Sequence, residues 1–232
     1  MAGNETAVIV GVGTNLSASL ARLFAKEGMK IALAARNAGK LAALAKETGA
    51  KTYACDAVDK GDVARLFAAV KSDLGAPDLV VYNASGRVRG PVTEVDPDEV
   101  DRAIRVTVFG GFLVAREAAI QMLAKGSGTI LFTGASASVK GYANSSVFAM
   151  GKFGLRGLAQ SLARELHPRN VHIGHVVIDG GISVGGRAGM PDRGPDGWLH
   201  PDEIAKAYLA LHRQQRSVWA WETEIRPWVE KF

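Results

Sequence analysis

The stretch Val8-Ile-Val-Gly-Val-Gly-Thr-Asn-Leu-Ser17 decides the fold of this chain. The continuous apolar run at residues 7–12 is typical of a strand that is buried on both faces. Residues 15–28 then carry their leucines at helical spacing, which predicts an amphipathic helix. Because Gly11 and Gly13 join strand to helix, we expect a tight turn that directs free N–H groups and a partial positive charge toward a phosphate.

The alternation of strand and helix continues along the rest of the chain. Further strands are expected at 30–35, 52–55, 79–82, 128–133 and 172–178, and further helices at 38–48, 62–72, 97–124, 145–166 and 201–214. This order predicts an α/β fold with a doubly wound, mostly parallel sheet and helices on both faces. We expect one Rossmann-type domain over residues 1–232, with an aromatic-rich last strand and tail after residue 218.

A segment rich in glycine and proline, at about residues 180–198, follows the last long strand. In folds of this type ligands bind beyond the carboxyl ends of the strands. The segment is therefore predicted to be a lid over a substrate, and the alternative is an ordinary surface loop.

Composition excludes several classes of function. The formal net charge is +5 and the basic residues are scattered, so nucleic-acid binding is not expected. Cys55 is the only cysteine and is predicted to be a small buried residue. No apolar run reaches about 18 residues, so we expect no membrane partner and a cytoplasmic location. The five histidines show no metal-ligand spacing, and no metal is expected.

Three further motifs follow the glycine turn in a fixed order. Asn83-Ala-Ser-Gly86 comes after the fourth strand, Phe148-Ala-Met-Gly-Lys152 lies in a long helix, and Ile178-Asp-Gly-Gly-Ile182 ends the sixth strand. Over roughly residues 6–185 the chain resembles the short-chain dehydrogenases/reductases. It departs from their T-G-x-x-x-G-x-G turn, because Asn15 and Ser17 stand at the second and third glycine positions.

The resemblance implies a nicotinamide dinucleotide cofactor. Arg36 follows the second strand, where NADP-using members place an arginine against the 2′-phosphate, so NADP is favoured over NAD. The alternative is a solvated arginine. The hydroxyl of Ser17 could donate to a phosphate. The candidate cofactor-binding residues are Gly11, Gly13, Asn15, Leu16, Arg36, Asp56, Asn83, Ala84, Lys152, Gly180 and Ile182.

The same resemblance places the catalytic positions. Family members use Tyr-x-x-x-Lys, which sets a phenol and an ammonium on one helical face. Here Lys152 is present but Phe148 replaces the tyrosine, and an aryl ring without a hydroxyl cannot transfer a proton. The family's serine and asparagine positions hold Ala135 and Thr107. Tyr142 and Ser136 are the candidate replacement hydroxyls.

Three hypotheses about function follow. The first is an NADP(H)-dependent oxidoreductase of small molecules with an altered proton relay. The second is a catalytically impaired nucleotide-binding or regulatory protein on the same fold, and the third is a purely structural subunit. The resemblance also implies a homodimer or homotetramer built through the long helices and the last strand.

Overall fold

The computed structural model describes residues 5–183 and 191–231. Within these residues seven strands form one sheet in the order β3-β2-β1-β4-β5-β6-β7, and every pairing is parallel. The strands are β1 (Thr6–Val10), β2 (Lys30–Ala35), β3 (Lys51–Ala54), β4 (Leu79–Tyr82), β5 (Gly128–Thr133), β6 (Val171–Ile178) and β7 (Glu222–Ile225). The predicted doubly wound parallel sheet is confirmed.

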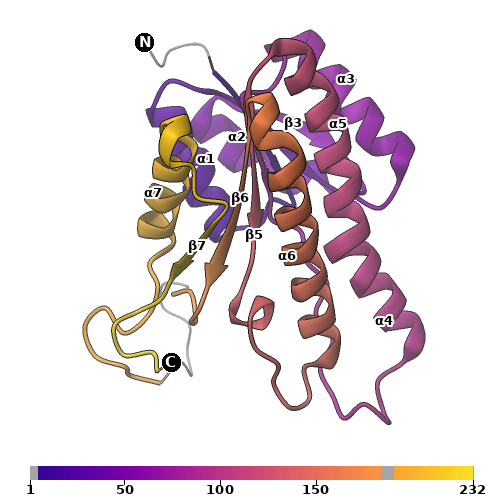
Figure 1. Ribbon diagram of the computed structural model, residues 1–232, viewed down its shortest axis with the longest axis vertical. Coiled ribbons are helices and arrows are strands. Elements are labelled where there is room, and N and C mark those ends of the chain that lie inside the picture. The colour runs from indigo at the N-terminus through magenta and orange to yellow at the C-terminus, as the bar shows by residue number, and fades with distance from the viewer. Residues whose placement is uncertain (1–4, 184–190, 232) are drawn as a thin grey trace.

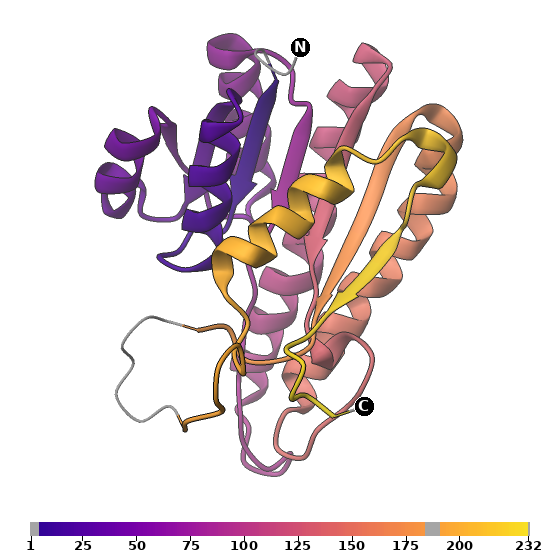
Figure 2. The same ribbon diagram turned by 90° about the vertical axis from the view of Figure 1, so that its left-hand side faces the viewer.

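Helices cover both faces of the sheet (Figure 1). They are α1 (Leu16–Lys26), α2 (Ala42–Thr48), α3 (Lys60–Leu74), α4 (Pro97–Ile104), α5 (Gly110–Lys125), α6 (Ser146–Leu166) and α7 (Pro201–His212). Figure 2 looks onto the face that α1 and α7 cover. There Leu20 and Phe24 of α1 share a buried cluster with Tyr208 of α7, whereas α3, α5 and α6 bury their apolar residues on the opposite face.

The expected helix over residues 97–124 contains a π-helical turn, Arg105–Phe109, between α4 and α5. Three of its five residues are β-branched, and such residues crowd a regular helix. Thr107, at the centre of the turn, is buried and its Oγ1 accepts a hydrogen bond of 2.9 Å from the Gly86 N–H. The turn therefore joins the helix to the loop after β4, and π turns are frequent at functional sites.

The helical run Pro97–Lys125 is, by length and composition alone, long and apolar enough to cross a membrane. Counting unbroken apolar residues did not predict this. In the fold, Val114, Ala118 and Met122 of α5 lie fully buried in the core cluster against the sheet. The apolar character of this helix thus serves, in part, to cover the sheet.

The glycine- and proline-rich segment lies partly outside the described residues, which omit 184–190. Its described ends meet, because Ile182 pairs with Leu199 in a parallel bridge and the Ser183 N–H donates to the Leu199 carbonyl at 2.8 Å. Gly181 lies so close to Trp198 that a Cβ there would stand 2.2 Å from the indole ring. These ends form a wall beyond the carboxyl end of β6.

Candidate active site

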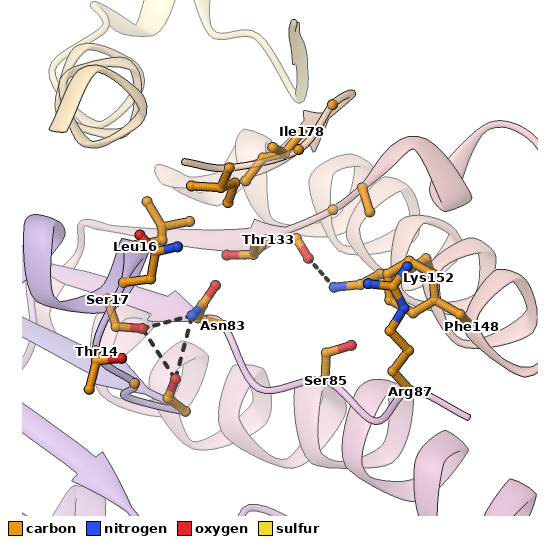
Figure 3. A pocket seen from close by; sticks show the side chains of 18 of the residues that line it. Thr14, Leu16, Ser17, Asn83, Ser85, Arg87, Thr133, Phe148, Lys152 and Ile178 are labelled. Atoms are coloured by element: carbon orange, nitrogen blue, oxygen red, sulfur yellow. Dashed lines mark hydrogen bonds between the residues drawn. The ribbon is translucent and has the colours of Figure 1, made fainter. Parts of the chain in front are cut away.

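The loops that follow β1, β4, β5 and β6 surround a cavity of about 710 Å³ at the carboxyl edge of the sheet (Figure 3). We call it the main cavity. Its lining residues are Gly11, Gly13, Thr14, Asn15, Leu16, Ser17, Asn83, Ser85, Arg87, Thr133, Gly134, Ala135, Phe148, Lys152, Ile178, Gly180, Gly181, Ile182 and Trp198. It therefore brings together residues from widely separated motifs of the sequence.

The glycine turn has the form expected of a phosphate site. Gly11 has a φ of +85°, and a Cβ there would lie 2.4 Å from the Ala84 nitrogen, so only glycine fits. The amides of Leu16 and Ser17 begin α1 and have no backbone acceptor in the part of the chain that the structure describes. No acidic residue lies in the first turn of α1. Free amides and a positive helix end fit a pyrophosphate.

Ser17 serves the turn in a way that the sequence did not indicate. Its hydroxyl donates to the Gly11 carbonyl at 3.2 Å and accepts from the Asn83 side-chain amide at 2.7 Å. The expected phosphate donor is thus already engaged. The Ser17 side chain, which is buried, ties the glycine turn to the loop after β4.

A second cavity, of about 420 Å³, adjoins the turn on its other side. Gly11, Gly13 and Asn83 line both cavities, and the second one also contains Arg36, Asp56 and Ala84 among its lining residues. Lys40 lines it too, which the sequence analysis missed. A second cation only four residues after Arg36 was the feature of the sequence that could have indicated Lys40 as a site residue. Two cations at one end of a dinucleotide-sized site suit a phosphate group.

Phe148 and Lys152 both lie on the α6 face that borders the main cavity. The Lys152 ammonium lies 5.8 Å from the centroid of the Phe148 ring and donates to the Thr133 carbonyl at 2.7 Å. Only 3% of Lys152 is exposed, and this burial lowers its pKa to about 8. The carbonyl satisfies one of its three N–H donors, so the others are available to a ligand.

The two candidate replacement hydroxyls do not reach the main cavity. Tyr142 is 48% exposed, and neither it nor Ser136 belongs to the lining. Ala135 occupies the lining position instead, because its N–H is held at 3.1 Å by the Ser138 hydroxyl in the short helical turn that follows. Ser136, the next residue, therefore does not line the main cavity. Among the described lining residues, Ser85 supplies a hydroxyl on the same side as Lys152 (Figure 3), whereas the Thr133 hydroxyl accepts a hydrogen bond of 2.8 Å from Tyr208.

A buried polar network lies behind Ala135. The Ser138 hydroxyl lies 3.4 Å from His175 Nε2, and His175 Nδ1 lies 3.0 Å from the Glu222 carboxylate. Burial lowers the pKa of His175 to about 4, so the ring is neutral, donates from Nδ1 and accepts from Ser138 at Nε2. Arg156 of α6 binds both Glu222 oxygens, at 2.6 and 2.7 Å. The network joins the cavity wall to β7.

Asp179 directly follows β6, at a position where the resemblance to the short-chain dehydrogenases/reductases implies a proline. Its backbone N–H donates to the Ile225 carbonyl at 2.8 Å, which a proline could not do. Its carboxylate is almost fully buried, 3.1 Å from the Lys140 ammonium and 3.4 Å from Arg226. Asp179 therefore holds the loop after β5 and the C-terminal tail beside the cavity, while its neighbours Gly180 and Ile182 line it.

Arg87 and Trp198 complete the lining, and the sequence analysis identified neither. Arg87 directly follows the Asn83–Gly86 motif, so its position after a recognised loop was the available signal. Trp198 was within the expected lid, and its neighbour Leu199 is joined to Ile182 of the cavity lining by a parallel bridge.

The chain belongs to the short-chain dehydrogenases, because the family model described as short chain dehydrogenase matches residues 5–185. A curated relative, short chain aldehyde dehydrogenase 1 of Euphorbia lathyris, is 30% identical over 83% of this chain and 69% of its own length. A solved short-chain dehydrogenase from Rhodopseudomonas palustris is 34% identical with a TM-score of 0.83, over 97% of this chain and 99% of that one. A metagenomic short-chain oxidoreductase, solved in complex with NADP, is 28% identical with a TM-score of 0.84, over 97% and 98% of the two chains.

Proposed function

We propose that this protein is an NADP(H)-dependent oxidoreductase of small molecules that works without the family's phenolic proton donor. The observation that carries the proposal is that two cavities lie on either side of the glycine turn and share its residues Gly11 and Gly13. Arg36, Lys40 and Asp56 lie in one cavity, and Lys152 with Phe148 lies in the other. Membership of the family and the similar NADP complex support the same cofactor class.

Each residue has a defined task in this proposal. The Leu16 and Ser17 amides hold the pyrophosphate, Arg36 holds the 2′-phosphate, and Asp56 lies at the adenine end. Lys152 donates to the ribose near the nicotinamide, while Gly180 and Ile182 border that end. The bound cofactor supplies the hydride.

The proton is the unusual part of the reaction. Phe148 and Ala135 present only carbon and hydrogen where the family has hydroxyls, so neither can give a proton to an alkoxide. A missing general acid typically costs about 10²–10⁴-fold in rate. Reduction of an activated C=C or C=N bond needs such an acid less than ketone reduction does, because the charge that develops is delocalised or already neutralised. Activated double bonds are therefore the favoured substrates.

The alternative is a protein that binds the cofactor without turnover. It is favoured by the same two residues, Phe148 and Ala135, which both line the main cavity. The two functions differ in one measurement, which is NADPH oxidation across a panel of ketones, enones and imines.

We also propose a homodimer or homotetramer. The outer faces of α5 and α6 expose Phe112, Ile120, Met150 and Phe153, each by 43–50%. Exposed apolar residues gathered on two neighbouring helices are typical of a subunit interface.

The decisive experiment is a titration of the purified protein with NADPH and with NADH. Trp198 lines the main cavity, so its fluorescence should report binding near the nicotinamide end. Micromolar binding that prefers NADPH is the expected result. Failure to bind either nucleotide would refute the oxidoreductase proposal and its alternative together.

A further inference from the structure

Arg87 lies directly over the aromatic ring that replaces the catalytic tyrosine. Its guanidinium carbon is 4.6 Å from the centroid of the Phe148 ring, and both side chains line the main cavity (Figure 3). A ring beneath a guanidinium fixes the plane of the group and leaves its N–H edges free to bind. Arg87 is therefore a rigid donor at the substrate end of the cavity.

Arg87 makes no direct contact with a carboxylate in the part of the chain that the structure describes. Within residues 5–183 and 191–231, neither Arg87 nor Arg89 has a hydrogen bond or an ion pair, and no Asp or Glu lines the main cavity. Arg87 and Arg89 also line a neighbouring hollow of about 430 Å³, where Arg36 and Arg102 outnumber the one carboxylate of the lining, Glu99. The burial of Arg87 and the charge of Arg89 both lower the pKa of Arg87. Two unpaired cations held close together favour the binding of an anion.

Apolar side chains also line this end of the cavity. Ile178, Ile182, Trp198 and the Phe148 ring supply apolar surface there, beside the polar Lys152 and Ser85. A ligand that fits both features has an apolar body and one anionic group. A planar guanidinium matches a carboxylate in bidentate geometry better than a lysine would.

We propose that Arg87 binds a carboxylate of the substrate, so that the substrates are small apolar carboxylic acids whose reducible bond lies close to the acid group. That the bound acid is a substrate rests on the proposed function, but the anion site itself does not depend on cofactor binding. Arg89 supports the site through its charge. Arg102 also lines the neighbouring hollow, but it lies 4.0 Å from Glu99 and is not part of the site.

The test uses two pairs of probes that have no reducible double bond, benzoate with benzamide and 3-phenylpropanoate with 3-phenylpropanamide. Each is titrated by calorimetry into the whole protein, with and without saturating NADPH. A charge-assisted bond to Arg87 predicts that at least one acid binds about 10- to 100-fold more tightly than its amide. Equal binding of acid and amide in both pairs would overturn the proposal.

Substitutions then test whether Arg87 is the residue that binds the acid. Arg87→Gln should abolish the preference for the acid while its NADPH affinity stays within about twofold, and Arg87→Lys should retain part of the preference. The matched control Arg102→Gln removes the same charge nearby and should leave the preference unchanged. A preference that survives in Arg87→Gln, or that is lost equally in Arg102→Gln, would contradict the assignment. A preference that persists in a protein that binds no NADPH would support the anion site and refute the oxidoreductase function.

Discussion

Lys152 and Phe148 lie one helical turn apart on α6, with the ammonium 5.8 Å from the centroid of the ring. The lysine has the surroundings of a functional group, because it is buried, lines the main cavity and donates to the Thr133 carbonyl. The ring occupies the adjoining position without a hydroxyl. The site therefore keeps the residue that would hold the cofactor and lacks the one that would move a proton.

Replacing Phe148 with tyrosine should show how far the missing phenol lowers the rate of ketone reduction. Phe148→Tyr is expected to raise kcat/KM for ketone reduction by about 10²–10⁴-fold, the usual contribution of a general acid. Phe153→Tyr, on the same helix but outside the lining of the main cavity, is the control and should leave kcat/KM for ketone reduction unchanged. If the wild type already reduces an activated double bond and Phe148→Tyr only alters that rate, the protein is an enzyme in its own right. Activity that appears solely in the variant would favour the non-catalytic alternative.

Cofactor preference should depend on the cations of the second cavity. Arg36→Ala is expected to weaken NADPH binding by about 10- to 100-fold, the value of a charge-assisted hydrogen bond, and to leave NADH binding nearly unchanged. Lys40→Ala should have a smaller effect of the same kind. Lys46→Ala, in α2 away from the cavity lining, serves as the control. Equal losses for both nucleotides would show that Arg36 does not contact the 2′-phosphate.

NADPH affinity should fall in alkaline solution. Because burial lowers the pKa of Lys152 to about 8, the free protein loses the ammonium proton above that pH. If the ribose requires the ammonium, affinity should decrease by roughly fivefold between pH 8 and pH 9. Lys152→Met should bind weakly and show no such decrease, while the exposed Lys206→Met should behave as the wild type. A wild-type affinity that stays constant across this range would argue against ribose binding by Lys152.

The Ser17 hydroxyl should contribute to the shape of the glycine turn. Ser17→Ala removes its bonds to the Gly11 carbonyl and to the Asn83 amide, and should lower the free energy of unfolding by about 1–2 kcal/mol. NADPH affinity should decrease with it. Ser19→Ala, on the same helix and also buried, removes no side-chain hydrogen bond within the described residues and is the matched control. Urea unfolding of the three proteins would measure the difference.

The buried His175 should lower the free energy of unfolding as the pH falls. Its pKa is about 4 in the folded state and about 6.5 when unfolded, so between these values the unfolded chain binds more protons and stability falls as the pH falls. From pH 7.5 to pH 5 this residue should account for about 2 kcal/mol of lost unfolding free energy. His175→Asn should flatten the dependence by that amount, even though it lowers stability at pH 7.5. The exposed His200→Asn should leave the pH dependence as it is, and an unchanged slope in His175→Asn would contradict a neutral buried ring.

Most of the fold could be predicted from local patterns. The strands β2, β4 and β5 have the bounds that their apolar runs indicated, because buried parallel strands consist of such runs. The helix expected at 38–48 instead begins as a 3₁₀ turn, Ala38–Leu41, and the one at 97–124 contains a π turn. Hydrophobic spacing does not distinguish these from α-helix, since their hydrogen bonds shift by only one residue.

Some residues of the candidate site could likewise be predicted from local patterns, and others could not. Gly11, Arg36, Asn83 and Lys152 were identified because each stands at a recognisable distance from a strand or helix end. Tyr142 and Ser136 could not be assessed, because the direction of a loop side chain depends on its tertiary contacts. Here the Ser138 hydroxyl holds the Ala135 N–H, and this contact sets which residue of the loop lines the cavity.

The sequence by itself therefore determined the parallel sheet and the family, and it predicted the phosphate turn and Phe148 at the position of the family's phenol, since all of these follow from the order and spacing of residues. Only the tertiary structure decided which groups meet at the substrate end. Arg87 meets Phe148 there, and Trp198 meets Gly181. Contacts of this kind join residues that are 61 and 17 positions apart through the packing of separate loops, and no local pattern encodes such distances.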